Sequence, residues 1–169
     1  WLPQPDEKCN QFVEFRHEFT LKEMDHTFSR LYISVDTEYA VWLNGTFVDC
    51  GQYDDFPRKK VYDILPIENL LKTGRNVLCI LAYYQGENSF QYMKGLPGLI
   101  YFLEAGQALI SSGQETICRE SREYKSGAVC KITSQLGYSY EYDAWGYDGW
   151  RSVEYDAGAE WTGAALVPA

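Results

Sequence analysis

Apolar and polar side chains alternate along the first part of the chain with a period of two. Within residues 12–19, Phe15 and Phe19 share one parity, whereas Glu14 belongs to the other. Residues 28–35 repeat the alternation in part. Because successive side chains of a strand point to opposite faces of a sheet, this period predicts β-strands in both segments.

Turn signals divide the remaining chain into further short elements. Asn44-Gly45 separates apolar segments at 39–43 and 46–48, and this dipeptide tolerates the positive φ angles of a type I′ turn, which predicts a β-hairpin. One helical turn is expected at 67–71, with Gly74 in the left-handed conformation after it. Further strands are expected over residues 61–64, 76–84, 99–104, 108–111, 116–119, 129–133 and 161–165.

This order of elements predicts an all-β protein: an antiparallel jelly-roll β-sandwich of the galactose-binding-domain-like type. The 169 residues are expected to form one domain, 1–169, with a core at about 10–135. A C-terminal segment, 138–169, carries many rings mixed with carboxylates. We expect this segment to pack on the core or on a neighbouring domain.

Composition adds limits on the partners. Eight Phe, 5 Trp and 14 Tyr suit a pleated sheet, and exposed rings could also stack on sugars. A net charge of −9 disfavours nucleic acid and anionic membranes, and no apolar stretch approaches the roughly 20 residues needed to span a bilayer. Five widely spaced cysteines suggest free thiols and a cytoplasmic location; a periplasmic or secreted location remains open if a leader was removed.

The sequence contains no pattern typical of a catalytic centre. There is no G-x-S-x-G motif and no phosphate-binding loop, and the imidazoles are His17, expected near the core, and His26, expected in a turn. Paired carboxylates such as Glu141 and Asp143 are interpreted as solvated charges. We therefore expect no catalytic residue and no cofactor. Calcium would suit the acidic loops, but no ligand spacing defines a site, so the metal is left unknown.

Six residues are the candidates for binding carbohydrate. Four contribute rings that could stack on the C–H faces of a sugar, and two contribute side chains that could bond its hydroxyl groups. They are Tyr92, Trp145, Tyr147, Trp150, Asp143 and Asn88. A purely structural role for the rings, in the core or against another domain, is the alternative.

The order of short motifs resembles the non-catalytic N-terminal β-sandwich domain of bacterial α-L-rhamnosidases. The motifs are Trp1-Leu2-Pro3, residues 15–19, Leu43-Asn44-Gly45, Tyr62-Asp63-Ile64, Gly74 with Asn76, Gly98-Leu99, Ser111-Ser112, Glu141-Tyr142-Asp143-Ala144, Trp150, and Trp161 with Ala164. The resemblance spans nearly the whole chain. Trp145 departs from it, since the family often has Arg there, and residues 114–118 lack a Trp that is common in the family.

What the resemblance implies is indirect. The catalytic acid and base of that family lie in a separate helical barrel, so no catalytic role is carried over to this chain. The chain is expected to be an accessory domain whose partner is the catalytic domain of the same parent chain, a glycoside hydrolase that removes terminal L-rhamnose. An autonomous module that binds rhamnose-containing or other plant-type glycans, and the sandwich domain of a β-galactosidase-like or β-glucuronidase-like hydrolase, are the alternatives.

Overall fold

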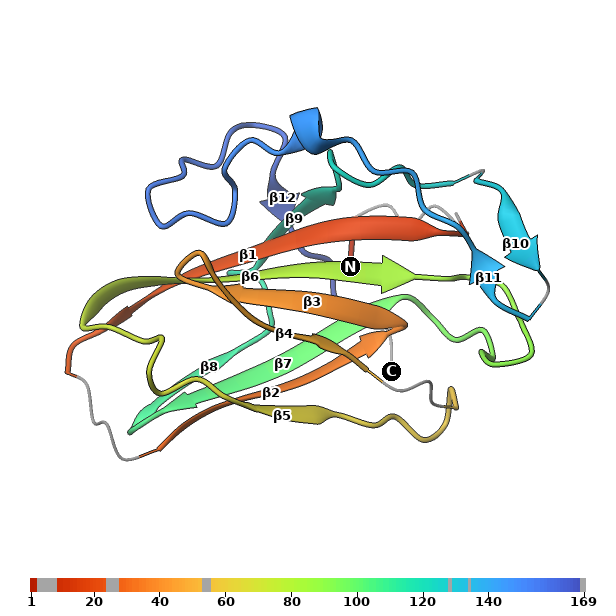
Figure 1. Ribbon diagram of the computed structural model, residues 1–169. Helices are drawn as coiled ribbons and strands as arrows, with labels where there is room; N and C mark the ends of the chain where they lie inside the picture. The colour runs from red at the N-terminus through yellow and green to blue at the C-terminus, as the bar shows by residue number, and fades with distance from the viewer. Residues whose placement is uncertain (3–8, 24–27, 53–55, 128, 134, 168–169) are drawn as a thin grey trace.

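The computed structural model describes residues 1–2, 9–23, 28–52, 56–127, 129–133 and 135–167, and it contains two stacked antiparallel sheets (Figure 1). The strands are β1 (Gln11–Leu21), β2 (Ser29–Asp36), β3 (Glu38–Leu43), β4 (Thr46–Gly51), β5 (Asp63–Pro66), β6 (Gly74–Tyr84), β7 (Gly98–Ala105), β8 (Ala108–Ser111), β9 (Ile117–Glu120), β10 (Lys131–Thr133), β11 (Gly137–Tyr138) and β12 (Thr162–Gly163). The predicted all-β, antiparallel sandwich is confirmed.

The larger sheet has the strand order β12-β9-β1-β6-β3-β4. Its two longest strands, β1 and β6, lie at the centre and pair along their whole length, with Phe15 opposite Ile80. The predicted hairpin joins β3 to β4, and both turn residues have positive φ, 53° at Asn44 and 83° at Gly45. Gly74 also has a positive φ, 91°, where the predicted turn ends and β6 begins.

The smaller sheet has the order β5-β2-β7-β8 and packs its inner face against the larger sheet. Leu31, Ile33 and Leu103 of the smaller sheet are fully buried with Val41 and Ile80 of the larger sheet in one apolar core. Each of these side chains lies on the side of its strand that points inward, as expected from the alternation of side chains along a strand. Burial of large aliphatic side chains between the sheets is the main stabilising term of such a sandwich.

The outer face of the larger sheet is covered by the chain that follows β11. In Figure 1 this segment, drawn in blue, runs over β1, β6 and β9 on the side away from the smaller sheet. Trp150 and Trp161 are buried there against Phe12, Val77 and Cys79. Strand β12 then pairs with β9, so the segment rejoins the sheet as its edge strand.

The cover explains why both parities of β1 are buried over residues 11–17. Arg16 donates hydrogen bonds to the carbonyl oxygens of Trp150 at 2.8 Å, Ser152 at 2.9 Å and Tyr155 at 3.2 Å. Glu14 accepts a 2.7 Å bond from Arg119, which also bonds the segment through other carboxylates. The polar side of β1 is therefore an internal attachment surface rather than a solvated face, because its side chains bind backbone and charges of the covering segment.

Two elements of the segment around residue 140 lack a sequence signal. The short strand β11 and the 3-10 turn at Ala144–Gly146, labelled η1, were not expected, whereas β10 lies within the strand predicted at 129–133. The remaining strands begin or end within a few residues of their predicted bounds. In the described residues, no helix is long and apolar enough to cross a membrane.

The five cysteines form no disulfide. Cys79 lies in β6 as the predicted small core residue, and burial raises the pKa of its thiol to about 12, so it stays protonated at neutral pH. His17 is buried near the core, as predicted. His26 lies outside the described residues.

Candidate functional site

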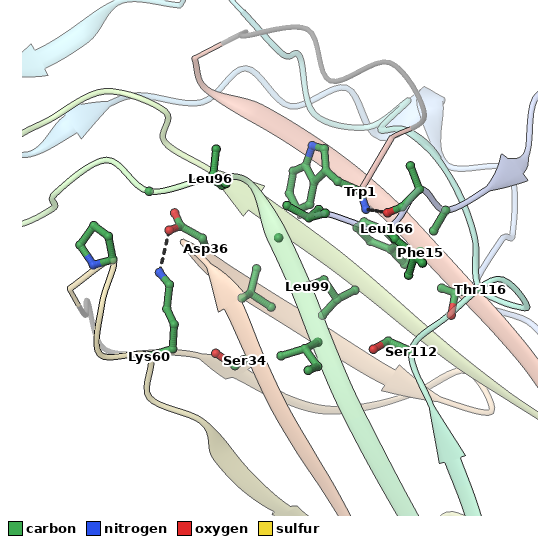
Figure 2. Close-up of a pocket in the computed structure, with 18 of the residues that line it drawn as sticks. Trp1, Phe15, Ser34, Asp36, Lys60, Leu96, Leu99, Ser112, Thr116 and Leu166 are labelled. Carbon is green, nitrogen blue, oxygen red and sulfur yellow. Dashed lines mark hydrogen bonds and ion pairs between the residues drawn. The ribbon is translucent and has the colours of Figure 1, made fainter. Parts of the chain in front are cut away.

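A groove of about 1090 Å³ opens at one end of the sandwich, beside the carboxyl end of β2 (Figure 2). Its walls come from the end of β2, the start of β7, the loop that precedes β7, and both ends of the described chain. Loops at the end of a rigid sandwich can present side chains without disturbing the core, so this position suits a binding site.

One end of the groove is charged. Asp36, at the end of β2, is almost fully buried, and its Oδ2 accepts a 2.7 Å bond from Nζ of Lys60. Its Oδ1 accepts bonds from the Tyr92 hydroxyl at 2.5 Å and from the Thr37 hydroxyl at 3.2 Å. Burial and this carboxylate raise the pKa of Tyr92, which keeps its hydroxyl a donor. Figure 2 shows Lys60 reaching Asp36 from the opposite wall.

The loop before β7 is held close to this carboxylate. A Cβ atom at Gly95 would lie 2.4 Å from Oδ2 of Asp36, so a residue with a side chain could not occupy this position unless the loop or the Asp36 side chain moved. The Tyr84 hydroxyl donates to the carbonyl of Gly95 at 2.9 Å, and Oδ1 of Asn88 accepts from the amide of Lys94 at 2.7 Å. These bonds give the loop a fixed shape over the charged end.

The other end of the groove is apolar. Figure 2 places Trp1, Leu99 and Leu166 along this end, with Leu96 nearer the charged pair. The chain ends are tied together here, because the Trp1 and Ala165 backbones exchange two 2.8 Å hydrogen bonds. The groove thus combines an apolar wall with a charged pair whose carboxylate is buried and whose ammonium group is partly exposed, which is a combination that suits an uncharged polar ligand with an apolar face.

The described residues of the groove do not supply the groups that hydrolysis requires. Asp36 is the one carboxylate among the described lining residues, whereas glycoside hydrolysis needs two on opposite sides of the bond. Across the described residues, no three His, Cys, Asp or Glu side chains gather in an arrangement that could hold a metal ion. The arrangement can therefore bind a ligand, and its described side chains supply no acid and base pair.

The structure divides the six predicted carbohydrate-binding residues between two regions. Asn88 lines the groove and Tyr92 supports its charged end, although the ring of Tyr92 is buried and its hydroxyl is taken by Asp36. The other four belong to the covering segment. Trp150 has no exposed surface, and its indole donates a 3.0 Å bond to Glu123. Trp150 therefore packs the outer face of the larger sheet instead of presenting a ring to a ligand.

Trp145 is the opposite case, because 96% of its surface is exposed. It lies in the turn η1, where Oδ1 of Asp143 accepts a 3.0 Å bond from the Trp145 amide. Gly146 packs so closely on the carbonyl of Arg122 that a Cβ there would lie 1.9 Å from it. Tyr147 is partly exposed, with its ring 4.8 Å from the Arg151 guanidinium. The turn thus holds an exposed indole on a fixed backbone.

Sequence reasoning missed the residues that define the groove. Neither Lys60 nor Asp36 belongs to a sequence pattern that marks a binding residue. The two are 24 residues apart and meet because the loop before β5 folds over the end of β2. Gly95, in the polar loop before β7, is a weak sequence signal that this loop approaches another group closely, in this case Asp36.

Comparisons with known proteins support the fold. No family model matches the sequence, and no curated protein matches it. Among solved structures, a GH78 family rhamnosidase of Bacillus sp. GL1 aligns with 96% of this chain and 17% of its own, at 24% identity and a TM-score of 0.83. An α-L-rhamnosidase from Aspergillus terreus aligns with 99% of this chain and 20% of its own, at 20% identity and a TM-score of 0.70.

A lectin from Pleurotus ostreatus shares the architecture more distantly, at 13% identity and a TM-score of 0.58 over 94% of this chain. At these identities the likeness is one of fold. The sequence-based resemblance to a rhamnosidase domain is confirmed at that level. The chain spans a fifth or less of the length of the two rhamnosidases, so its fold recurs as one part of much longer glycoside hydrolases.

Proposed function

We propose that this chain is a non-catalytic accessory domain of an α-L-rhamnosidase-type glycoside hydrolase. The observation that carries the proposal is the match of nearly the whole chain to less than a fifth of the Bacillus enzyme, at a TM-score of 0.83. The order of sequence motifs along the chain points to the same family. In this account the acid and base lie in a separate catalytic domain, and the present domain supports or extends its substrate site.

The test compares two purified proteins: the 169-residue chain and the product of the complete reading frame that encodes it, which the proposal predicts to be a longer protein. Each is assayed for hydrolysis of an aryl α-L-rhamnoside, with aryl β-galactoside and β-glucuronide as alternative substrates. We expect the longer protein to release the aryl group from the rhamnoside and the short chain to release none. Turnover of only the galactoside or glucuronide would replace the rhamnosidase assignment, and turnover by the short chain would overturn the accessory role.

The groove favours a second candidate function, carbohydrate binding by the domain itself. An apolar wall beside a Lys60–Asp36 pair suits a deoxy sugar, because its methyl and C–H groups can lie on apolar side chains while its hydroxyls bond the charged groups. Lys60 is partly exposed and can reach a ligand, whereas Asp36 is nearly buried. The lectin likeness in fold is compatible with this use.

This candidate is tested by titrating the chain with L-rhamnose and rhamnosylated oligosaccharides while following its NMR spectrum. Shallow sugar sites bind at about millimolar to micromolar Kd. We expect saturable shifts in the loop at 88–96 and at least a tenfold weaker Kd in Lys60→Met. The exposed Lys125, paired with Glu141 away from the groove, provides the control variant Lys125→Met. Shifts confined to residues near Trp145 would move the sugar to the covering segment, and no shifts would remove this candidate.

A further inference from the structure

The smaller sheet has an apolar outer face with no described segment over it. Its outward side chains, which we call the bare face, are Tyr32, Tyr62, Ile64, Ile100, Phe102 and Leu109. Ile100 and Leu109 expose 66% and 65% of their surfaces. Strand register places Tyr32 opposite both Ile64 and Phe102, so these side chains lie on one side of the sheet.

The charges on this face have partners within the domain. Among the described strand residues, Arg30, Asp36 and Glu104 are the charged side chains on the outward side, and Arg30 is directly opposite Glu104 in register. Asp36 is nearly buried and paired with Lys60. Glu104 accepts a 3.2 Å bond from the Tyr32 hydroxyl, and the Arg30 guanidinium lies 4.0 Å from the centre of the Phe28 ring. The remaining surface offers a partner rings and aliphatic groups, which is unusual for the exterior of a chain with a net charge of −9.

We propose that the bare face is the surface on which the rest of the parent chain packs; this rests on the proposed function. The solved rhamnosidases with this fold devote 14% to 20% of their length to the matching region, so in those enzymes a large partner belongs to the same chain. The outer face of the larger sheet is already covered by residues of this chain, which leaves the smaller sheet for that partner. Mainly apolar contact with few charges is typical of a permanent interface.

The groove supports the same assignment. A shallow hollow on the bare face is lined by Tyr62 and Phe102, and it shares Ser34, Lys60 and Ile100 with the groove. Leu166 and Val167 line the groove as well. A segment that followed residue 167 in a longer chain would therefore leave the domain beside the bare face, within reach of it.

The test uses two matched isoleucines. Ile100 in β7 and Ile132 in β10 are both in strands and expose 66% and 59% of their surfaces, but Ile132 lies away from the bare face. Ile100→Lys and Ile132→Lys are made in the 169-residue chain and in the longer protein that contains it. Melting temperature is measured for all of them, and hydrolysis of an aryl rhamnoside is measured for the longer proteins.

We expect Ile100→Lys to lower the melting temperature of the longer protein by several degrees, because it buries an unpaired charge at the interface. The same variant in the short chain and Ile132→Lys in either protein should change it by a degree or less. The proposal would be overturned if the two variants lowered the melting temperature of the longer protein equally. It would also be overturned if Ile100→Lys lowered the melting temperature of the short chain as much as that of the longer protein. If the short chain formed dimers that Ile100→Lys dissociates, the partner on the bare face would be a second copy of this chain and not the rest of the parent chain.

The activity measurement separates this inference from the proposed function. A longer protein without rhamnosidase activity but with the selective effect of Ile100→Lys would contradict the proposed function and retain the interface. A longer protein with rhamnosidase activity, in which both variants melt alike, would retain the proposed function and remove the interface.

Discussion

The two sheets of the sandwich treat their outer faces in different ways. The larger sheet has its outer face covered by residues 140–161, which bury Trp150 and Trp161 and bind Arg16 through backbone carbonyls. The smaller sheet leaves Ile100 and Leu109 exposed. Both faces are rich in large side chains, so apolar content alone does not distinguish them. What distinguishes them is the pattern of buried polar groups. Arg16 bonds the backbone carbonyls of the covering segment, and among the described residues no outward side chain of the smaller sheet makes such bonds.

The largest loss of stability is expected when Trp150, which anchors the covering segment on the larger sheet, is removed. Trp150→Ala leaves a large cavity against β6 and should lower the free energy of unfolding by about 3–5 kcal/mol. Trp145→Ala, in the same segment but 96% exposed, should change it by less than about 0.5 kcal/mol. Urea unfolding followed by circular dichroism measures both. Similar losses for the two tryptophans would contradict the burial described for the covering segment.

A smaller loss of stability is expected when the hydrogen bonds that hold the covering segment are removed and its apolar contacts are kept. Arg16→Met preserves most of the aliphatic stem but leaves the carbonyls of Trp150, Ser152 and Tyr155 without this donor. Unpaired buried acceptors cost free energy, so we expect a loss of roughly 3 kcal/mol by urea unfolding. Limited proteolysis should then cut first within residues 150–156. Cleavage that begins elsewhere would show that Arg16 does not hold the cover.

His17, which lies between the two sheets, should make the stability of the chain depend on pH. His17 shares a 2.5 Å hydrogen bond with the Tyr101 hydroxyl, which joins β1 to β7, and burial lowers the pKa of His17 although Glu115 opposes this. The unfolded chain binds a proton at His17 more readily than the folded chain does. The contribution of neutral His17 to stability is therefore fully present above about pH 6.5 and is lost as the pH falls below it.

We therefore expect the melting temperature of the chain to fall between pH 7.5 and 5.5, and to fall less in His17→Gln. Thermal unfolding at both pH values, for both proteins, measures the difference. An identical decline in the variant would assign the effect to other groups.

The smallest effect on stability is expected at the bare face of the isolated chain. Leu109→Thr removes an exposed aliphatic side chain from a strand position that a β-branched residue suits, so the free energy of unfolding should change by less than about 0.5 kcal/mol. Binding of the hydrophobic dye ANS should decrease. A large loss of stability would mean that Leu109 packs within the domain and is not part of an interface.

The sequence predicts the sandwich well because its signals are local. Alternation in β1 and the Asn44-Gly45 turn depend on neighbours in the chain, and both appear where expected. The same alternation does not reveal that the polar side of β1 is buried, because that depends on a segment more than a hundred residues away. Trp145 and Trp150 lie five residues apart in one aromatic run, and composition does not distinguish the exposed ring from the buried one.

The groove was beyond prediction for a related reason. Asp36 and Lys60 come together through the loop before β5, and their pairing depends on the positions of two sheets. The contrast between the two outer faces likewise follows only from strand register. The likeness in fold to a rhamnosidase domain could be predicted, because it follows from the order of short motifs along the chain.

Side-chain footprinting with hydroxyl radicals tests the assignment of the two faces most directly. Oxidation rates of Tyr62, Ile100 and Leu109 are compared between the isolated chain and the longer protein, with Trp150 as the reference that is buried within the domain. The account predicts that the three bare-face residues react readily in the isolated chain and are protected several-fold in the longer protein, while Trp150 is protected in both. Equal oxidation of the three residues in both proteins would contradict it.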